Sequence, residues 1–391
     1  MDGKKSTFEN LLTRAVDEVI VKDSLLNRLK SDDTLVVKLG IDPTGSELHL
    51  GHSVVLRKLR EFQDLGHRVV FVIGDFTAKI GDPSGRTQER KNLTDKQIKE
   101  NMKSYREQAG KILDLNKADF QFNSTWLGKL GVEGIFELAS KATIAQIMER
   151  SEFRSRLEHK VDVPYLEMLY PLLQGYDSVH LKADLELGGT DQKFNLLMGR
   201  QIQKRYNQKE QEIMLLKLLP GTDGAKMSKS ANNYISLNSN PYDMFGKIMS
   251  ISDDLIPTYL ELCTSLELSN ISGTPNKIDQ KKLLAREIVR IYHNEKLADE
   301  AEDNFKKVFQ EGKYEESLLI ENTLKAGFYK PTEIGISSGA TTSTVQAKEL
   351  IRQGAIIING KTFNPSDWSQ AIELTPGTLI QIGKRRIVKV Q

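Results

Sequence analysis

The stretch "TLVVKLGIDPTGSELHLGHSVVLRKLREFQDLGHRVVFVIGD" (34–75) decides the fold. Its two ends, 34–41 and 68–75, are β-branched apolar runs, which are typical of buried strands in a parallel sheet. Between them, 53–66 carries apolar residues at helical spacing and ends in Gly66, a common helix stop. Strand, helix and strand in this order predict a βαβ unit, and so a fold of the α/β class.

The same alternation extends outward across the first half of the chain. The segment 192–206 has the spacing of another helix, and 212–219 reads as another strand. We therefore expect a Rossmann-like, doubly wound parallel sheet over residues 1–222.

A helical part follows this sheet. Residues 223–330 begin with a loop and continue with amphipathic segments, which predict an α-helical domain. The helices are expected at 240–251, 253–263 and 280–293.

The last part, residues 331–391, predicts a small α+β domain. A linker of small residues at 335–344 is expected to cap a helix at 345–353. The segment 354–363 has the pattern of a strand followed by an Asn-Gly turn, and 377–390 has the pattern of a hairpin. This part holds seven lysines and arginines against four acidic residues, so its excess of positive charge hints at a polyanionic partner.

Composition places the chain among globular proteins with more than one domain. Of its 391 residues 39% are apolar and 28% are charged, which is ordinary for such proteins. Cys263 is the only cysteine, which excludes an intrachain disulfide and a multi-cysteine zinc site and fits a reducing compartment. The N-terminal residues resemble no signal peptide, and no apolar run approaches the length of a membrane span, so the sequence predicts a cytoplasmic protein.

Two histidines lie where the first predicted strand gives way to a helix. Ligands of doubly wound sheets bind outside the carboxyl ends of the strands, and phosphates favour helix N-termini. His49 and His52 are three residues apart, so both imidazoles lie on one helix face and can act on one phosphate chain. Gly51 lets a ligand approach the backbone. In isolation, the pattern also fits a capped helix start with two solvated histidines.

A lysine-rich loop forms the second candidate site. The segment "DGAKMSKSANN" (223–233) holds Lys226, Lys229 and Ser230 among small residues. Two lysines three positions apart can close on a triphosphate and follow the charge that develops during its cleavage. A solvated basic loop is the plain alternative for a lysine pair alone.

Together the two segments resemble a known family. "HLGH" (49–52) resembles the HIGH signature of class I aminoacyl-tRNA synthetases, and "KMSKS" (226–230) is their second signature, in the same order. Three more stretches, "IGDPSGRTQER" (80–90), "YPLLQGYD" (170–177) and "GGTDQ" (188–192), resemble bacterial tyrosyl-tRNA synthetases. The resemblance runs in sequence order over nearly the whole chain.

The resemblance implies a ligase that activates tyrosine with ATP, accompanied by Mg²⁺, and then transfers it to tRNA(Tyr). It also implies a homodimer. The implied catalytic residues are His49, His52, Arg86, Arg90, Lys226 and Lys229. The implied ATP-binding residues are Gly40, Asp42, Thr44, His49, Gly51, His52, Gly188, Gly189, Asp191, Gln192, Lys226, Lys229 and Ser230. The implied tyrosine-binding residues are Asp82, Asn123, Tyr170, Gln174, Asp177 and Gln192. No dedicated protein site for Mg²⁺ is expected, since phosphates and water can hold the ion.

The chemistry of tyrosine supports the pocket independently. A substrate ammonium in a partly dry site needs acceptors, which Asp82, Tyr170 and Gln174 supply. A phenolic hydroxyl also needs a partner, and we expect Asp177 to be that partner. A buried polar group left unpaired would then reject phenylalanine.

The chain departs from the family at three positions. Lys38 and Leu39 stand where the family commonly has Tyr and Cys, so we expect Asp177 to share the hydroxyl with another group or water. Arg86 stands where a Lys is usual, which keeps the charge but changes the geometry.

The C-terminal domain resembles an RNA-binding module found in a small-subunit ribosomal protein, in pseudouridine synthases and in bacterial tyrosyl-tRNA synthetases. In that module Lys348, Arg352 and Lys361 would contact an RNA backbone, with salt-sensitive affinity. A small β-rich cap with solvated lysines is the alternative.

Three other functions share parts of this pattern. A tryptophanyl-tRNA synthetase has the same fold and signatures, but an indole offers no hydroxyl to Asp177. A small-molecule nucleotidyltransferase uses a similar histidine turn, but needs neither the helical domain nor the basic tail. A non-catalytic RNA-binding factor would not require the intact histidines and lysines.

Overall fold

The computed structural model describes residues 8–31, 33–84, 93–229, 231–274, 276–309, 320–338, 341, 343–359, 361–365, 368–382 and 386–391. The chain divides into two compact units. The first comprises 1–239 and 251–280, and the second comprises 240–250 and 281–391. The domain boundaries predicted near 222 and 330 remain predictions.

A six-stranded sheet forms the centre of the first unit. The strand order is β1-β6-β5-β2-β3-β4, and the strands are β1 (Val16–Ile20), β2 (Val36–Ile41), β3 (Arg68–Ile73), β4 (Ala118–Phe122), β5 (Leu185–Gly189) and β6 (Glu212–Leu216). The strands β2 to β6 run parallel, and β1 pairs antiparallel with β6 at one edge. The predicted α/β fold with a doubly wound parallel sheet is confirmed.

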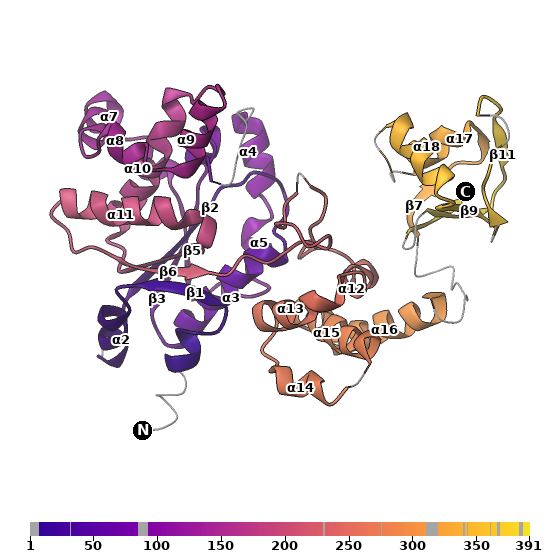
Figure 1. Ribbon diagram of the computed structural model, residues 1–391, viewed down its shortest axis with the longest axis horizontal. Helices are drawn as coiled ribbons and strands as arrows, with labels where there is room; N and C mark the ends of the chain where they lie inside the picture. The colour runs from indigo at the N-terminus through magenta and orange to yellow at the C-terminus, as the bar shows by residue number, and fades with distance from the viewer. Residues whose placement is uncertain are drawn as a thin grey trace. The chain divides into compact units, whose positions relative to one another are not determined.

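Helices cover both faces of this sheet. Figure 1 shows α10 (Tyr165–Leu181) and α11 (Lys193–Arg205) on one side, and α2 (Lys22–Lys30) and α3 (Leu50–Asp64) on the other. The helix α3 lies within the predicted βαβ unit and ends before Gly66, whose positive φ of 88° is a conformation that glycine adopts without strain. The remaining elements of this unit are η1 (Thr77–Lys79), α4 (Asp95–Met102), α5 (Tyr105–Ala109), α6 (Ser124–Leu127), α7 (Gly131–Ala139), α8 (Ile144–Ile147), α9 (Ser151–Glu158), η2 (Thr190–Gln192), η3 (Asp253–Leu255), α13 (Ile256–Cys263) and α14 (Leu268–Ser272).

The two helices α10 and α11 cross at unusually small residues. A Cβ added to Gly175 would lie 3.3 Å from the Cα of Gly199 and 3.1 Å from Cγ1 of Ile202. The absence of a side chain at Gly175 therefore lets α10 approach α11 closely. The helix that carries Gln174 and Asp177 is thus packed directly against α11.

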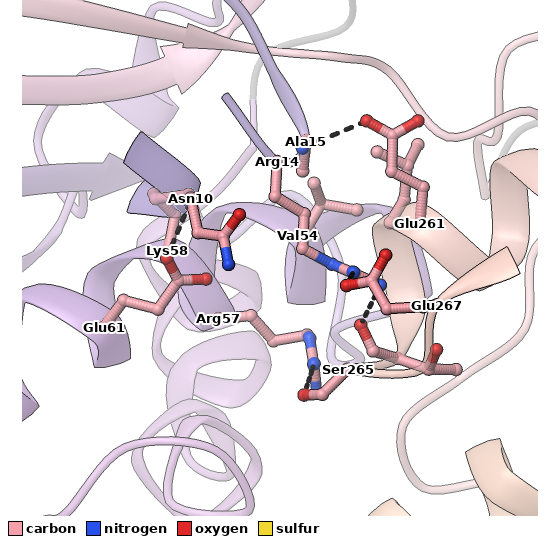
Figure 2. Close-up of a pocket in the computed structure, with 12 residues that line it drawn as sticks. Asn10, Arg14, Ala15, Val54, Arg57, Lys58, Glu61, Glu261, Ser265 and Glu267 are labelled. Carbon is pink, nitrogen blue, oxygen red and sulfur yellow. Dashed lines mark hydrogen bonds and ion pairs between the residues drawn. The ribbon is translucent and has the colours of Figure 1, made fainter. Parts of the chain in front are cut away.

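A polar clip ties the N-terminal segment to α3 and α13 (Figure 2). Arg14 donates to Glu267 at 2.7 Å and to the backbone carbonyl of Leu260 at 3.2 Å, near the C-terminal end of α13. Lys58 of α3 is 1% exposed and donates to the carbonyl of Leu11 at 2.9 Å and to Glu61 at 2.7 Å. These bonds satisfy groups that would otherwise be costly to bury.

The second unit combines helices with small sheets. Its helices include α12 (Pro241–Met249) and α16 (Glu295–Phe309), while α15 (Lys277–Tyr292) begins in the first unit. The C-terminal elements are β7 (Ile320–Leu324), β8 (Gly327–Tyr329), α17 (Pro331–Ser337), α18 (Thr344–Arg352), β9 (Ile356–Ile358), β10 (Lys361–Thr362), β11 (Ile372–Leu374), β12 (Leu379–Ile382) and β13 (Arg386–Val390). They form sheets of order β10-β9-β12-β13-β7 and β11-β8.

The prediction of a linker at 335–344 is wrong for its first three residues. Residues 335–337 end the helix α17, which begins at Pro331 and buries Ile334 completely. A Cβ on Gly335 would lie 3.1 Å from Cβ of Ala347 in α18. The small residues of this segment therefore allow two helices to pack closely, and sequence composition alone does not distinguish such packing from a linker.

A membrane span needs a helix that is both long and apolar. Among the helices of the described residues, none is long enough and apolar enough to cross a bilayer.

Candidate active site

The predicted site residues of the first unit gather at the carboxyl ends of β2 and β5. The strand order reverses between these two strands, and such switch points are where doubly wound sheets bind ligands. Gly40 lies in β2, and a Cβ added to it would meet no atom of the described structure within 4 Å. The sheet therefore leaves open space over this end of β2.

The histidine turn is ordered by its own hydrogen bond. The backbone N–H of His49 donates to Nδ1 of His52 at 3.1 Å, and the two ring centroids are 3.8 Å apart. Since Nδ1 of His52 accepts, its proton resides on Nε2, which becomes a donor. Among the described residues, Nδ1 of His49 is buried and meets no hydrogen-bond partner.

Both histidines are neutral donors at neutral pH. Loss of solvation, and then the nearby ammonium of Lys229, together lower the pKa of His49 to about 3. The pKa of His52 is also well below its usual range, because of lost solvation and then the neighbouring His49 and Lys229. The turn therefore offers hydrogen bonds to a phosphate without adding positive charge of its own.

The lysine loop lies against this turn and against the β5 end. A Cβ on Gly45 would be 3.0 Å from both Cδ and Nζ of Lys229, so this side chain runs over the loop after β2. Lys226 forms an ion pair with Asp191 at 2.7 Å. Asn233 donates to the backbone carbonyl of Lys226 at 3.1 Å and so helps to hold the loop. The structure thus brings both predicted lysines to the site.

Asp42, at the end of β2, is a partly buried carboxylate with two hydroxyl partners. Thr77 donates to Oδ1 at 2.7 Å, and the phenol of Tyr170 donates to Oδ2 at 3.0 Å. Desolvation, with a smaller contribution from the charge of Asp82, raises the pKa of Asp42 to about 7, although the hydrogen bonds from Thr77 and Tyr170 oppose the rise. A Cβ on Gly74 would lie 2.0 Å from Oδ1 of Asp42, so only glycine fits there. Because the hydroxyl of Tyr170 donates to Asp42, its oxygen keeps lone pairs that can accept a further hydrogen bond.

Asp82 lies in a second polar cluster. It accepts from Gln192 at 2.7 Å and from the hydroxyl of Ser84 at 2.7 Å. Arg150 is 1% exposed and donates to Ser84 at 2.6 Å and to Asn195 at 2.5 Å. Sequence reasoning missed Arg150 and Asn195, because neither belongs to a local pattern that marks it.

Asp177 of α10 is buried and held by two donors. Trp126 donates to Oδ1 at 2.8 Å, and Asn123 donates to Oδ2 at 3.2 Å. Burial raises the pKa of Asp177 to about 6, although the ammonium of Lys38 and these two donors oppose the shift. Trp126 was not predicted. A buried indole N–H needs an acceptor, but the sequence does not show which one it finds.

Lys38 in β2 is completely buried, and its ammonium is fully engaged by the protein. It donates to the backbone carbonyl of Gln174 at 3.0 Å and to the hydroxyl of Ser178 at 2.9 Å, and pairs with Glu186 at 3.0 Å. Three partners account for its three N–H groups. Lys38 therefore does not replace the missing family tyrosine as a donor to the substrate hydroxyl.

The other predicted residues are placed as follows. Gly188 and Gly189 end β5, and a Cβ on Gly189 would lie 2.6 Å from Asp191, so the turn needs a glycine. Thr44 donates its backbone N–H to the carbonyl of Asp42 at 2.8 Å. Lys348, Arg352 and Lys361 are exposed side chains of the second unit. Arg86, Arg90 and Ser230 lie outside the described residues.

The sequence matches a known family over most of its length. Residues 30–310 match the family described as "tRNA synthetases class I (W and Y)". The chain is 45% identical to a tyrosine–tRNA ligase of Carboxydothermus hydrogenoformans, over 100% of this chain and 98% of that protein. It is 43% identical to a tyrosine–tRNA ligase of Thermotoga maritima, over 97% of this chain and 96% of the relative.

Solved structures share the fold. A C-terminally truncated mitochondrial tyrosyl-tRNA synthetase of Aspergillus nidulans superposes with a TM-score of 0.65 at 22% identity, covering 78% of this chain and 94% of that one. A tyrosyl-tRNA synthetase of Archaeoglobus fulgidus complexed with L-tyrosine gives a TM-score of 0.62 at 23% identity, covering 77% of this chain and 100% of that one. At these identities the likeness concerns the fold alone.

Proposed function

The chain belongs to the tyrosine–tRNA ligases of class I, and we propose that the site at β2 and β5 carries out both of their steps. The tyrosine carboxylate attacks the α-phosphorus of ATP, and pyrophosphate leaves. The tyrosyl group then passes to the 3′-terminal adenosine of tRNA(Tyr). The observation that carries the proposal is the meeting of the histidine turn with the lysine loop, where Lys229 runs over Gly45.

Catalysis is proposed to rest on positioning and electrostatics. Neutral His49 and His52 donate to the phosphates from the start of α3, which is a favoured anion position. Lys226 and Lys229 neutralise the charge that develops on the leaving pyrophosphate. Arg86 and Arg90 are proposed to assist.

The tyrosine pocket is proposed to bind both the ammonium and the phenolic hydroxyl of tyrosine. Asp82, together with the oxygens of Tyr170 and Gln174, accepts from the substrate ammonium. Asp177 accepts from the phenolic hydroxyl. Phenylalanine would leave this buried carboxylate without that partner, and tryptophan would offer no hydroxyl to it.

Mg²⁺ is proposed to arrive with ATP. Within the described residues, no group of three or more His, Cys, Asp and Glu side chains is arranged to hold a metal ion. Phosphate oxygens and water are proposed to hold the ion, as is usual for Mg²⁺ with a nucleotide.

The partner of α7 to α10 is proposed to be a second copy of the chain. These helices expose large apolar side chains: Val132 at 68%, Phe136 at 69%, Ile144 at 71% and Tyr165 at 71%. An apolar surface of this kind marks an interface. Phe136→Asp should convert a dimer into monomers in sedimentation, whereas a wild-type monomer would contradict the proposal.

The C-terminal part is proposed to bind tRNA. Lys348 and Arg352 on α18 and Lys361 in β10 are exposed cations, and phosphate contacts of this kind make affinity salt-dependent. Deleting 331–391 should spare tyrosyl-adenylate formation and weaken aminoacylation. Equal loss of both activities would contradict a tRNA-specific role. A cytoplasmic location, where tRNA and ATP meet, is part of the same proposal.

ATP–pyrophosphate exchange with tyrosine, phenylalanine and tryptophan tests the proposed reaction. Exchange with tyrosine alone is expected. Exchange with tryptophan would overturn the role of Asp177, and no exchange with any of the three would favour a non-catalytic RNA-binding factor.

A further inference from the structure

We propose that the buried Lys38–Glu186 ion pair is a positioning element of the tyrosine pocket. The pair holds Gln174 and Asp177 in place through its hydrogen bonds to α10. The inference rests on the proposed substrate contacts of those two residues. It explains the presence of Lys38 where the family commonly has Tyr. Lys38 is not among the residues predicted to contact substrate.

The pair is built into the sheet. Lys38 and Glu186 are register partners on the neighbouring strands β2 and β5, and they are 0% and 1% exposed. Gln211 also donates to Glu186 through its amide. Burying two charges is expensive unless each is paired and hydrogen-bonded, and here both conditions are met.

From this pair, contacts extend to α10 on both sides of Asp177. Lys38 donates to the backbone carbonyl of Gln174 at 3.0 Å and to the hydroxyl of Ser178 at 2.9 Å. Ser178 in turn donates to Glu186 at 3.1 Å. The turn of helix that carries Asp177 is therefore anchored to two strands by charge-assisted bonds, which are the stronger kind.

The same pair sets the orientation of the Gln174 amide. Its Nε2 donates to Oε1 of Glu186 at 3.1 Å. With the nitrogen directed to Glu186, the amide oxygen is left as the acceptor for the substrate ammonium. Without the Glu186 carboxylate, the amide would be free to turn and present a donor to a cation.

Lys38 also affects Asp177 through its charge. The ammonium opposes the rise of the Asp177 pKa that burial causes, while Glu186 adds to that rise. The ammonium thus favours the ionised carboxylate, which is the form that accepts from a phenol.

The test compares Lys38→Met with a matched buried lysine elsewhere. Lys58→Met breaks the contacts of Lys58 with Glu61 and Leu11 in the clip of Figure 2, where the proposed tyrosine contacts play no part. In pyrophosphate exchange, Lys38→Met should raise the KM for tyrosine about 10-fold and lower the tyrosine/phenylalanine ratio by about the same factor. The KM for ATP should stay within about twofold, and Lys58→Met should leave all three quantities unchanged.

A double variant separates positioning from stability. Lys38→Met alone leaves Glu186 buried and unpaired, which lowers Tm, whereas Lys38→Met with Glu186→Gln removes both charges and should recover Tm. The raised tyrosine KM should persist in the double variant because the anchors on α10 are still missing. A tyrosine KM within about twofold of wild type in either variant, or an equal rise in Lys58→Met, would overturn the inference. Pyrophosphate exchange by the wild-type protein tests the proposed function separately. The inference about Lys38 depends only on how the variants' kinetic constants compare with those of wild type.

Discussion

The proposed site has two ends: a phosphate end, made of the histidine turn and the lysine loop, and a tyrosine end around Asp177. The two ends are built differently. At the phosphate end, a turn at 45–52 and a loop at 226–229 supply the two histidines and the two lysines, and Nδ1 of His52 is occupied as an acceptor, which leaves its Nε2 as the donor. At the tyrosine end, Asp177 is held by Trp126 and Asn123, and a buried ion pair anchors its helix. The phosphate end therefore adapts to charge that moves, while the tyrosine end is fixed before the substrate arrives.

The difference follows from what each end has to recognise. A triphosphate changes its charge distribution during the reaction, so long lysine side chains and uncommitted donors suit it. A phenol is distinguished from a benzene ring by one hydroxyl, so its acceptor must be held in one place. Substitutions at the two ends should accordingly affect different kinetic quantities.

The largest effect is expected from Asp177→Ala, which removes the only charge proposed to meet the hydroxyl. Discrimination between tyrosine and phenylalanine in kcat/KM should be lost. For a site that hydrogen-bonds a substrate hydroxyl the factor is about 10⁵, a value already established for tyrosyl-tRNA synthetases as a family. Exchange assays with both amino acids measure it. Asp64→Ala, which breaks a surface pair with Arg60, is the control, and unchanged selectivity in Asp177→Ala would refute the assignment.

At the phosphate end, His52→Ala should reduce kcat and spare tyrosine binding. Removal of one donor to the transition state typically costs about 10²–10³ in rate. Single-turnover formation of the adenylate measures the effect on the chemical step, and the KM for tyrosine, measured in parallel, shows whether tyrosine binding is affected. His159→Ala, at an exposed histidine, should have no effect. A change confined to tyrosine KM would mean that His52 belongs to the other end.

A smaller effect is expected from Gly45→Ala. The added methyl group would lie 3.0 Å from Cδ and Nζ of Lys229, so the lysine has to move by a few tenths of an ångström or more. A displaced catalytic group should slow adenylate formation by about 10-fold, less than loss of a donor. Gly273→Ala is the control, since its Cβ would meet no described atom within 4 Å. Full activity in Gly45→Ala would show that Lys229 adjusts without loss.

More of the phosphate end than of the tyrosine end could be predicted from the sequence. The phosphate end is local: "HLGH" and "KMSKS" each bring their groups together within one short segment, so their spacing carries the information. At the tyrosine end, Asp177 was predicted from its helix, but Trp126, Glu186 and Gln211 come from separate elements. Only the sheet register makes Lys38 and Glu186 neighbours. Strands β1, β4 and β5 were not predicted either, because they lack a distinctive apolar run, which β6 has at the same length.

The smallest effect concerns Asp42, which lies between the two ends and bonds to Tyr170. Its pKa is raised to about 7 in the folded protein, so the folded state binds more protons than the unfolded state from about pH 4 to 7. Stability attributable to this group therefore falls as pH rises through that window, and the loss is complete above pH 7. Asp42→Asn cannot ionise; its amide oxygen still accepts from one of the two hydroxyls of Thr77 and Tyr170, and its NH2 group faces the other as a donor. Its Tm should exceed that of wild type by a margin that grows between pH 5 and pH 7 and stays constant above pH 7. Thermal unfolding of both proteins across this range measures the margin. A margin independent of pH would mean that Asp42 stays ionised throughout this range and would contradict the raised pKa.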